Sequence, residues 1–226
     1  MEFLPSLAGL AHWFIDLVLH LDTHLVELLA QFGPWIYAVL FLIIFAETGF
    51  VVTPFLPGDS LLFAVGALAA VDTSGTLNAP LISVLLVAAA ILGNTANYSI
   101  GRAIGPRAFS GRYRFLKVDY LHQTEAFFQR YGGTAIIVSR FMPIIRTFAP
   151  FVAGIGQMRY ARFQGFNIAG AFLWVMLFIW GGYLFGNIPL VKKNFGIVTI
   201  LIIVISVLPA GIAMIRGRRG SGGRPP

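Results

Sequence analysis

The chain has 226 residues, of which 58% are hydrophobic and only 11% are charged. Soluble domains carry charges on about a quarter of their residues, so this composition excludes an ordinary soluble protein and predicts a polytopic membrane domain. The net charge is +7, and every lysine and arginine lies at Arg102 or beyond. In a membrane protein this asymmetry reports topology, and we expect no nucleic-acid partner.

Residues 10–31 have the pattern of an amphipathic helix. His12, Asp16, His20 and His24 recur every fourth residue and form one polar stripe, with apolar residues on the other side. Such a helix is expected to lie on the membrane surface. The stripe also has the spacing of metal ligands, but we interpret it as the solvent-exposed face of a surface helix and predict no metal site.

Residues 35–70 form an apolar segment that is broken in the middle. An apolar run ends near Glu47, and a second piece follows Asp59 but is too short to span a bilayer, which takes about 20 residues. The break contains Pro54, Pro57 and Gly58. Two short apolar arms joined by such residues are typical of a re-entrant hairpin, whose tip must be buried in protein or line a watery cavity.

The next segments predict a span and a loop. Residues 80–100 are long and apolar enough to cross the membrane, and residues 101–120 contain five basic residues and form the clearest cytoplasmic loop. A second short amphipathic helix is expected at 120–131. Later spans are predicted at about 163–186 and 195–215, and residues 217–226 are expected to be a disordered basic tail.

A second broken apolar segment occupies residues 134–156. Its polar and helix-breaking residues are Arg140, Pro143, Arg146 and Pro150. We assign Pro143 and Pro150 to a second hairpin tip. Because Pro143 lies between the two arginines, they are not expected to share one unbroken helix.

The two halves of the chain are related by an approximate repeat. Phe55-Leu56-Pro57 matches Phe141-Met142-Pro143 at an offset of 86 residues, and NYSIG at 97–101 matches GYLFG at 182–186 at an offset of 85. We therefore divide a single membrane domain, residues 1–216, into three parts. These are a first repeat at about 10–101, a second at about 118–187, and an extra span at about 195–215.

Charge predicts that the repeats are inverted. The first hairpin lacks basic residues and the second is flanked by them, so the two are expected to enter from opposite sides of the membrane. The predicted fold is an all-α polytopic membrane protein with two opposed re-entrant helical hairpins, transmembrane helices and amphipathic surface helices. The C-terminus is expected in the cytoplasm and the N-terminal helix on the outer, periplasmic face.

Four charged residues carry the predicted chemistry. An ionised acid at membrane depth costs about 3 kcal/mol or more, so Glu47 and Asp59 are candidates for proton coupling. In a purely structural alternative, Asp59 caps a helix and Glu47 bonds the broken backbone. Arg140 and Arg146 are candidates for binding a phosphate, since the arginine guanidinium makes bidentate hydrogen bonds to such anions. Their structural alternative is to neutralise the two acids.

Other polar residues give weaker signals. Asn94 and Asn97 lie three apart on one predicted helix and either line the same cavity or make hydrogen bonds in the core. The tryptophans, including Trp174, are interpreted as interfacial or packing residues. Without a Walker loop, a nucleophile elbow or a zinc-protease motif, we predict a transporter and not an enzyme, with no cofactor.

These motifs carry a resemblance to a known family. The stretches FAETGFVVTPFLPGDSLLFAVGALA, SRFMPIIRTFAPFVAGIGQM and ARFQGFNIAGAFLW make residues 10–215 resemble the DedA family of bacterial membrane proteins. That family shares its VTT domain with the eukaryotic SNARE-associated Golgi protein group, and the likeness is to DedA proteins proper. The resemblance implies two opposed re-entrant hairpins, and its required acids and arginines fall on Glu47, Asp59, Arg140 and Arg146. Asn94 departs from the family, in which aspartate is frequent.

The resemblance also implies a function in the bacterial inner membrane. Members are expected to return undecaprenyl phosphate, or a related phospholipid, across the membrane at the expense of the proton gradient. We therefore expect a lipid-phosphate flippase with lipid and protons as partners and leave a homo-oligomer open. A proton-coupled antiporter of a small ion and a non-catalytic envelope assembly protein are the alternatives.

Overall fold

The structure, a computed structural model, describes residues 21–50, 58–73, 75–105, 132–194, 196–198, 200–202 and 204. The regular structure in these residues is helical, which confirms the predicted all-α class. The following statements concern these residues only. The stripe residues His12, Asp16 and His20, the tip residues Pro54 and Pro57, the predicted helix at 120–131 and the tail at 217–226 lie outside them.

Two helices have the length and composition of membrane spans. These are α5 (Ala79–Ile104) and α9 (Tyr160–Phe185), each 26 residues long. At about 1.5 Å per residue such a helix exceeds the hydrocarbon core of a bilayer, which is about 30 Å thick. They coincide with the spans predicted at 80–100 and 163–186.

Three further apolar helices are too short to cross a bilayer. They are α3 (Ile36–Gly49), α4 (Gly58–Val71) and α8 (Pro143–Ile155). At 13 or 14 residues each, they reach about 20 Å. They occupy the positions of the predicted hairpin arms. Re-entrant insertion and inversion of the repeats stay predictions.

One compact unit combines residues 1–39, 57–83 and 175–204. In it, α2 (Leu21–Phe32) leads into a short 3-10 turn, η1 (Gly33–Trp35), and α2 packs against α4. The loop before α5 is tied to Tyr37, whose hydroxyl donates to the carbonyl of Thr76 and accepts from the N–H of Asn78. The short α10 (Pro189–Lys193) also belongs to this unit.

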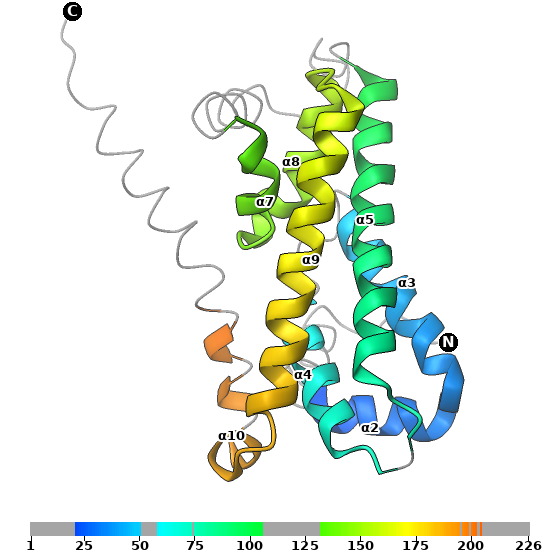
Figure 1. Cartoon of the computed structure of the whole chain (residues 1–226), viewed down its shortest axis with the longest axis vertical. Coiled ribbons are helices and arrows are strands. Elements are labelled where there is room, and N and C mark those ends of the chain that lie inside the picture. The colour runs from blue at the N-terminus through cyan, green and yellow to red at the C-terminus, as the bar shows by residue number, and fades with distance from the viewer. Residues whose placement is uncertain are drawn as a thin grey trace, which may run out of the picture. The chain divides into compact units, whose positions relative to one another are not determined.

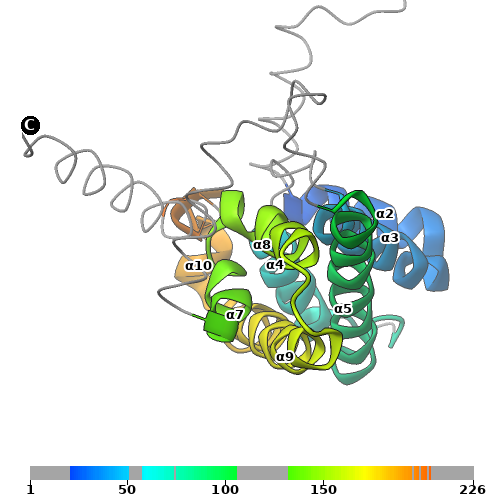
Figure 2. The same ribbon diagram turned by 90° about the horizontal axis from the view of Figure 1, so that it is seen from above.

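A second unit combines residues 40–56, 84–174 and 205–226. Within it, the later part of α5 and the first part of α9 run side by side in opposite directions (Figures 1 and 2), joined by a hydrogen bond from Gln164 to Thr95. The turn η3 (Gly132–Thr134), α7 (Ala135–Ser139) and α8 pack beside them. The core comprises Tyr98, Ile136, Ala149, Ala153 and Phe163.

Helices approach each other closely where glycines replace side chains. In the second unit, the α5 glycine Gly101 lies against the backbone of Phe151, and the α8 glycine Gly154 lies against the backbone of Tyr98. In the first unit, Gly66 of α4 lies against the backbone of Ile179 in α9. Each unit therefore contains a short apolar helix that crosses a long helix in backbone contact.

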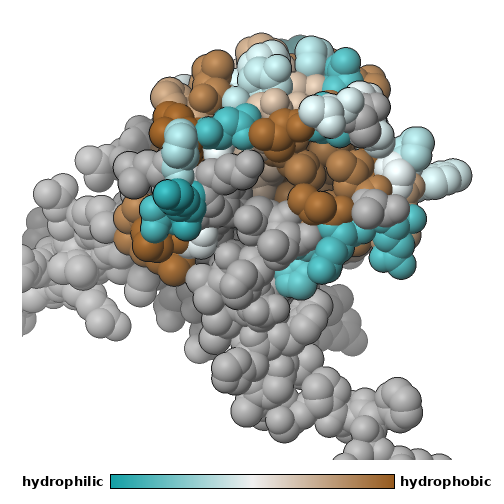
Figure 3. All heavy atoms as spheres, turned by 90° about the horizontal axis from the view of Figure 1, so that it is seen from below, coloured by the Kyte–Doolittle hydropathy of each residue, from teal (hydrophilic) through white to brown (hydrophobic). Residues whose placement is uncertain are grey.

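Large apolar side chains cover much of the surface. Exposed examples are Trp35, Val84, Ile168, Phe172 and Leu184, with exposures of 51% to 74%. Figure 3 shows apolar residues, in brown, at the surface beside polar ones. Soluble monomers seldom expose so many, so this surface is suited to lipid contact.

The structure corrects one hairpin assignment. Pro150 lies inside α8 and not at a tip, whereas Pro143 begins that helix. Proline within a helix removes the hydrogen bond that its own N–H would have donated and crowds the carbonyl four residues earlier, but at Pro150 it does not end the helix. The helix therefore continues through Pro150 to Ile155, and the chain break falls at 140–142 instead.

Candidate functional site

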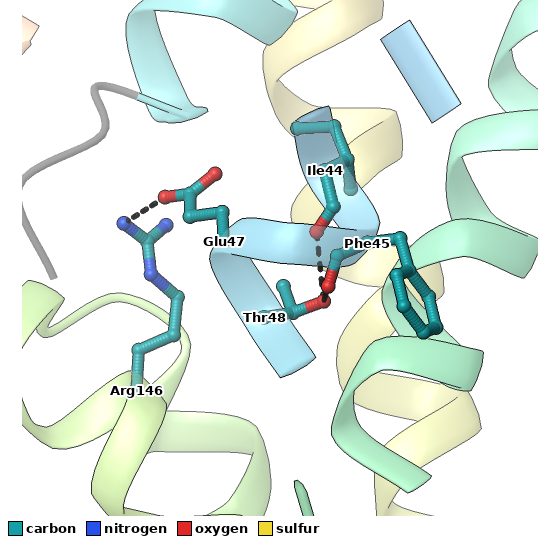
Figure 4. Close-up of polar contacts among 5 residues, drawn as sticks. All are labelled: Ile44, Phe45, Glu47, Thr48 and Arg146. Carbon is teal, nitrogen blue, oxygen red and sulfur yellow. Dashed lines mark hydrogen bonds and ion pairs between the residues drawn. The ribbon is translucent and has the colours of Figure 1, made fainter. Parts of the chain in front are cut away.

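Glu47 lies near the end of α3 and is fully buried. Its carboxylate oxygen Oε1 lies 2.7 Å from Nη2 of Arg146, forming an ion pair in which both side chains are at most 3% exposed. The neighbouring Thr48 hydroxyl turns back onto its own helix and donates to the carbonyl of Ile44. The Glu47 side chain, in contrast, points away from α3 toward Arg146, as Figure 4 shows.

The break between α7 and α8 follows from local sequence. Met142 is extended, with φ −124° and ψ 101°, because a residue before proline is driven out of the helical region. Pro143 then takes the first helical position, where its missing N–H costs nothing. As a result Arg140 lies at the end of α7 and Arg146 lies one turn into α8, confirming that the two arginines do not share a helix.

Both arginines face one aromatic ring. The guanidinium carbons of Arg146 and Arg140 lie 5.1 Å and 5.9 Å from the centre of the Trp174 ring, within the range of cation–π attraction. Trp174 is completely buried, so it is not an interfacial residue. The negative face of its ring offsets part of the repulsion between the two cations.

Asn97 holds the elements that carry the ion pair. Its side-chain amide donates to the carbonyl of Thr147, at 2.7 Å, and to that of Thr48, at 3.3 Å. These two residues directly follow Arg146 and Glu47. One buried carboxamide on α5 therefore fixes the backbone beside both partners of the ion pair.

Replacing Asn97 with leucine, which has a similar volume, should lower the free energy of unfolding by about 1–3 kcal/mol, because two buried carbonyls lose a donor. Thermal unfolding of purified protein in detergent measures the effect. Ser99→Ala is the matched control on the same helix, since the exposed Ser99 hydroxyl bonds the carbonyl of Thr95, one turn earlier on its own helix. Equal unfolding temperatures for the two variants would show that the hydrogen bonds of Asn97 do not stabilise the backbone beside the ion pair.

Arg140 is held by neutral groups. Its Nη2 donates to Oδ1 of Asn167, at 2.7 Å, and to the carbonyl of Ala90, at 3.3 Å. Asn94 donates to the same Asn167 oxygen, at 3.1 Å. Thus Asn94 and Asn97 both make the core hydrogen bonds that were one of their two predicted roles.

The second unit therefore gathers most of the predicted site. Glu47, Arg140, Arg146, Asn94 and Asn97 all belong to it. Its described buried side chains of the acidic and basic residue types comprise two guanidiniums and one carboxylate. Such a set favours an anionic ligand.

Asp59 and Gly58 belong to the first unit. Gly58 begins α4, and Asp59 lies in its first turn, where a carboxylate is stabilised by the helix dipole. Asp59 is 5% exposed. Asp59 therefore lies inside the first turn of α4 and not at the capping position before the helix, and a role in proton coupling stays a prediction. Among the described residues, no cluster of three or more histidines and acids has the arrangement of a metal site.

Sequence reasoning missed Asn167 and Trp174. The available signal was polarity inside an apolar span, because Gln164 and Asn167 lie three residues apart on α9 and share a face. Their side chains are hydrogen-bonded to each other at 3.1 Å. Polarity marks Gln164 and Asn167 in the sequence, but it does not show that their partners, Thr95 and Arg140, lie on other helices.

Comparison with known proteins gives a consistent relationship. A family model described as the VTT domain matches residues 56–184. The chain is 51% identical over 213 residues to protein DedA of Escherichia coli K12, covering 94% of this chain and 97% of the relative. It is 37% identical over 159 residues to inner membrane protein YqjA of the same organism, covering 70% and 71%.

A second bacterial species supplies another relative. An uncharacterized membrane protein of Mycobacterium tuberculosis H37Rv is 40% identical over 199 residues, covering 86% of this chain and 85% of the relative. No solved structure matches the chain.

Proposed function

The chain belongs to the DedA family of VTT-domain membrane proteins, and from this premise we propose that it is an inner-membrane lipid-phosphate translocase. Its proposed substrate is undecaprenyl phosphate, the polyprenyl carrier lipid of cell-wall synthesis, and its transport depends on the proton gradient. The relatives are named as membrane proteins, in agreement with the two apolar spans.

One observation carries the proposal: two buried arginines share the Trp174 ring, and one of them is paired with Glu47. Arginine binds phosphate through several N–H donors at once. Arg146 also lies near the N-terminal end of α8, where the helix dipole favours an anion. A phosphate monoester is an anion that suits this combination.

The ion pair suggests how a proton acts. Protonation neutralises the Glu47 carboxylate and weakens its attraction for Arg146, which is then able to bind the substrate phosphate. Asp59 is proposed as a second proton-accepting group. Deprotonation on the cytoplasmic side restores the pair and releases the phosphate, while the polyprenyl tail stays in lipid.

A cation antiporter fits these residues less well. A metal cation or organic cation approaching Glu47 would meet two guanidiniums within the same unit, and like charges in a low dielectric repel strongly. The buried charges thus favour an anionic headgroup over a cation.

Purified protein in vesicles containing labelled undecaprenyl phosphate should move the lipid between leaflets, faster with an imposed pH gradient. Arg146→Gln should reduce flipping at least about tenfold, since one charge-assisted contact is worth about 1.5–3 kcal/mol. Lys193→Gln, at the end of α10, is the control and should retain the wild-type rate. Full transport by Arg146→Gln, or no flipping by the wild type, would refute the proposal.

A further inference from the structure

The two buried arginines differ in what holds them. Arg146 is paired with a carboxylate, whereas both hydrogen-bond acceptors of Arg140 are neutral: the Asn167 side chain and the Ala90 carbonyl. Arg140 is only 1% exposed. Its Nε and Nη1 have no hydrogen-bond partner among the described residues, which leaves three of its five N–H donors available to an acceptor.

Asn167 is oriented by its own network. Its amide nitrogen donates to the carbonyl of Ile91 and to the side-chain oxygen of Gln164, both at 3.1 Å. Gln164 in turn donates to the hydroxyl of Tyr160, at the exposed start of α9. With its nitrogen engaged in this way, the Asn167 oxygen is directed to the guanidinium of Arg140.

The same face of α9 is shaped around Arg140. A Cβ atom added at Gly170 would lie 3.1 Å from Cδ and 3.2 Å from Nε of Arg140, which is closer than ordinary contact. Asn167, Gly170 and Trp174 therefore provide an acceptor, space and an aromatic face along one side of the helix. None of the three brings a charge.

We propose that Asn167 is a positioning residue that holds Arg140 without a directly hydrogen-bonded carboxylate, so that Arg140 makes the first contact with the substrate's phosphate monoester. A carboxamide satisfies one edge of the guanidinium without neutralising it. Arg146 joins the phosphate only after it leaves Glu47. This inference rests on the proposed function and adds an order of contacts to it.

The test replaces Asn167 with aspartate, which has the same shape and still accepts from Arg140. The new carboxylate forms an ion pair with Arg140 and competes with phosphate. We expect at least about tenfold weaker binding per folded protein, the equivalent of one charge-assisted contact. Thermal stability should fall as well, because the carboxylate oxygen that replaces the amide nitrogen cannot donate to the Ile91 carbonyl or to Gln164. If Asn167 only supported the fold, binding per folded protein would stay at the wild-type level.

Binding is measured in nanodiscs with undecaprenyl phosphate and, in a separate arm, with inorganic phosphate. Saturation with the lipid but not with the free ion identifies the lipid headgroup as the ligand, while saturation with the free ion as well shows that the phosphate suffices. Asn78→Asp is the matched control, because Asn78 caps α5 through its side-chain oxygen and aspartate can do the same. The control should bind as the wild type does.

Asn167→Ser provides an independent readout. Serine stays neutral but reaches less far, so this variant should unfold at a lower temperature yet bind phosphate within about threefold of the wild type, per folded protein, since only positioning is lost. Wild-type affinity in Asn167→Asp, or a loss in Asn167→Ser as large as that in Arg140→Gln, overturns the inference. If the wild type binds neither probe, the proposed function itself fails.

Discussion

Replacing Glu47 with alanine should lower the free energy of unfolding by about 3–5 kcal/mol, because it leaves the buried Arg146 guanidinium without its carboxylate. Arg146→Ala should have a similar effect, since it strands the Glu47 carboxylate. Both side chains are at most 3% exposed. Denaturant or thermal unfolding in detergent measures the change.

An exposed contact between a histidine and a carboxylate is the matched control. Glu27 lies 3.4 Å from His24 on α2, and its side chain is 74% exposed. Glu27→Ala should change stability little, because exposed pairs are screened by water. An effect of Glu47→Ala as small as that of Glu27→Ala would contradict the buried pair.

A double variant separates the structural part of the pair from its function. Glu47→Gln combined with Arg146→Met removes both charges and fills similar volumes, so stability should return to near the wild-type value. Transport should not return, since the proposed proton carrier and one phosphate ligand are missing. A double variant that both folds and transports would show that the pair only fastens α3 to α8.

Replacing Gly182 with alanine should destabilise the protein by about 1–3 kcal/mol or more, the usual cost of overpacking. Gly182 is on α9, and an added Cβ would overlap the carbonyl oxygen of Phe63 on α4. The obstacle is backbone, so it does not move aside as a flexible side chain would. Thermal unfolding measures the loss.

The adjacent glycine is the control. An added Cβ at Gly181 meets no atom within 4 Å, so Gly181→Ala should be neutral or raise stability by up to about 1 kcal/mol, as alanine favours a helix over glycine. Two neighbouring glycines of one helix are thus expected to respond in opposite directions. Equal responses would contradict the close crossing of α4 and α9.

The sequence predicted the elements well where the signal is local. The spans at 80–100 and 163–186 follow from long apolar runs, and the break before Pro143 follows from the restriction that proline places on Met142. Pro150 was misassigned because a proline looks the same in sequence whether it breaks a helix or is tolerated inside one. The packing around α8 decides between these outcomes, and sequence spacing does not report it.

The sequence by itself determined the membrane class, the helices and the rare charges that had to be important, since an apolar chain makes each buried charge costly. Only the tertiary structure decided that Glu47 pairs with Arg146 and that Asn97 bridges their helices. It also decided that Arg140 donates a hydrogen bond to the neutral Asn167 side chain and not to a carboxylate. The bonds from Asn97 reach 49 and 50 residues along the chain, and no periodic pattern links residues so far apart. Their meeting depends on how the helices pack.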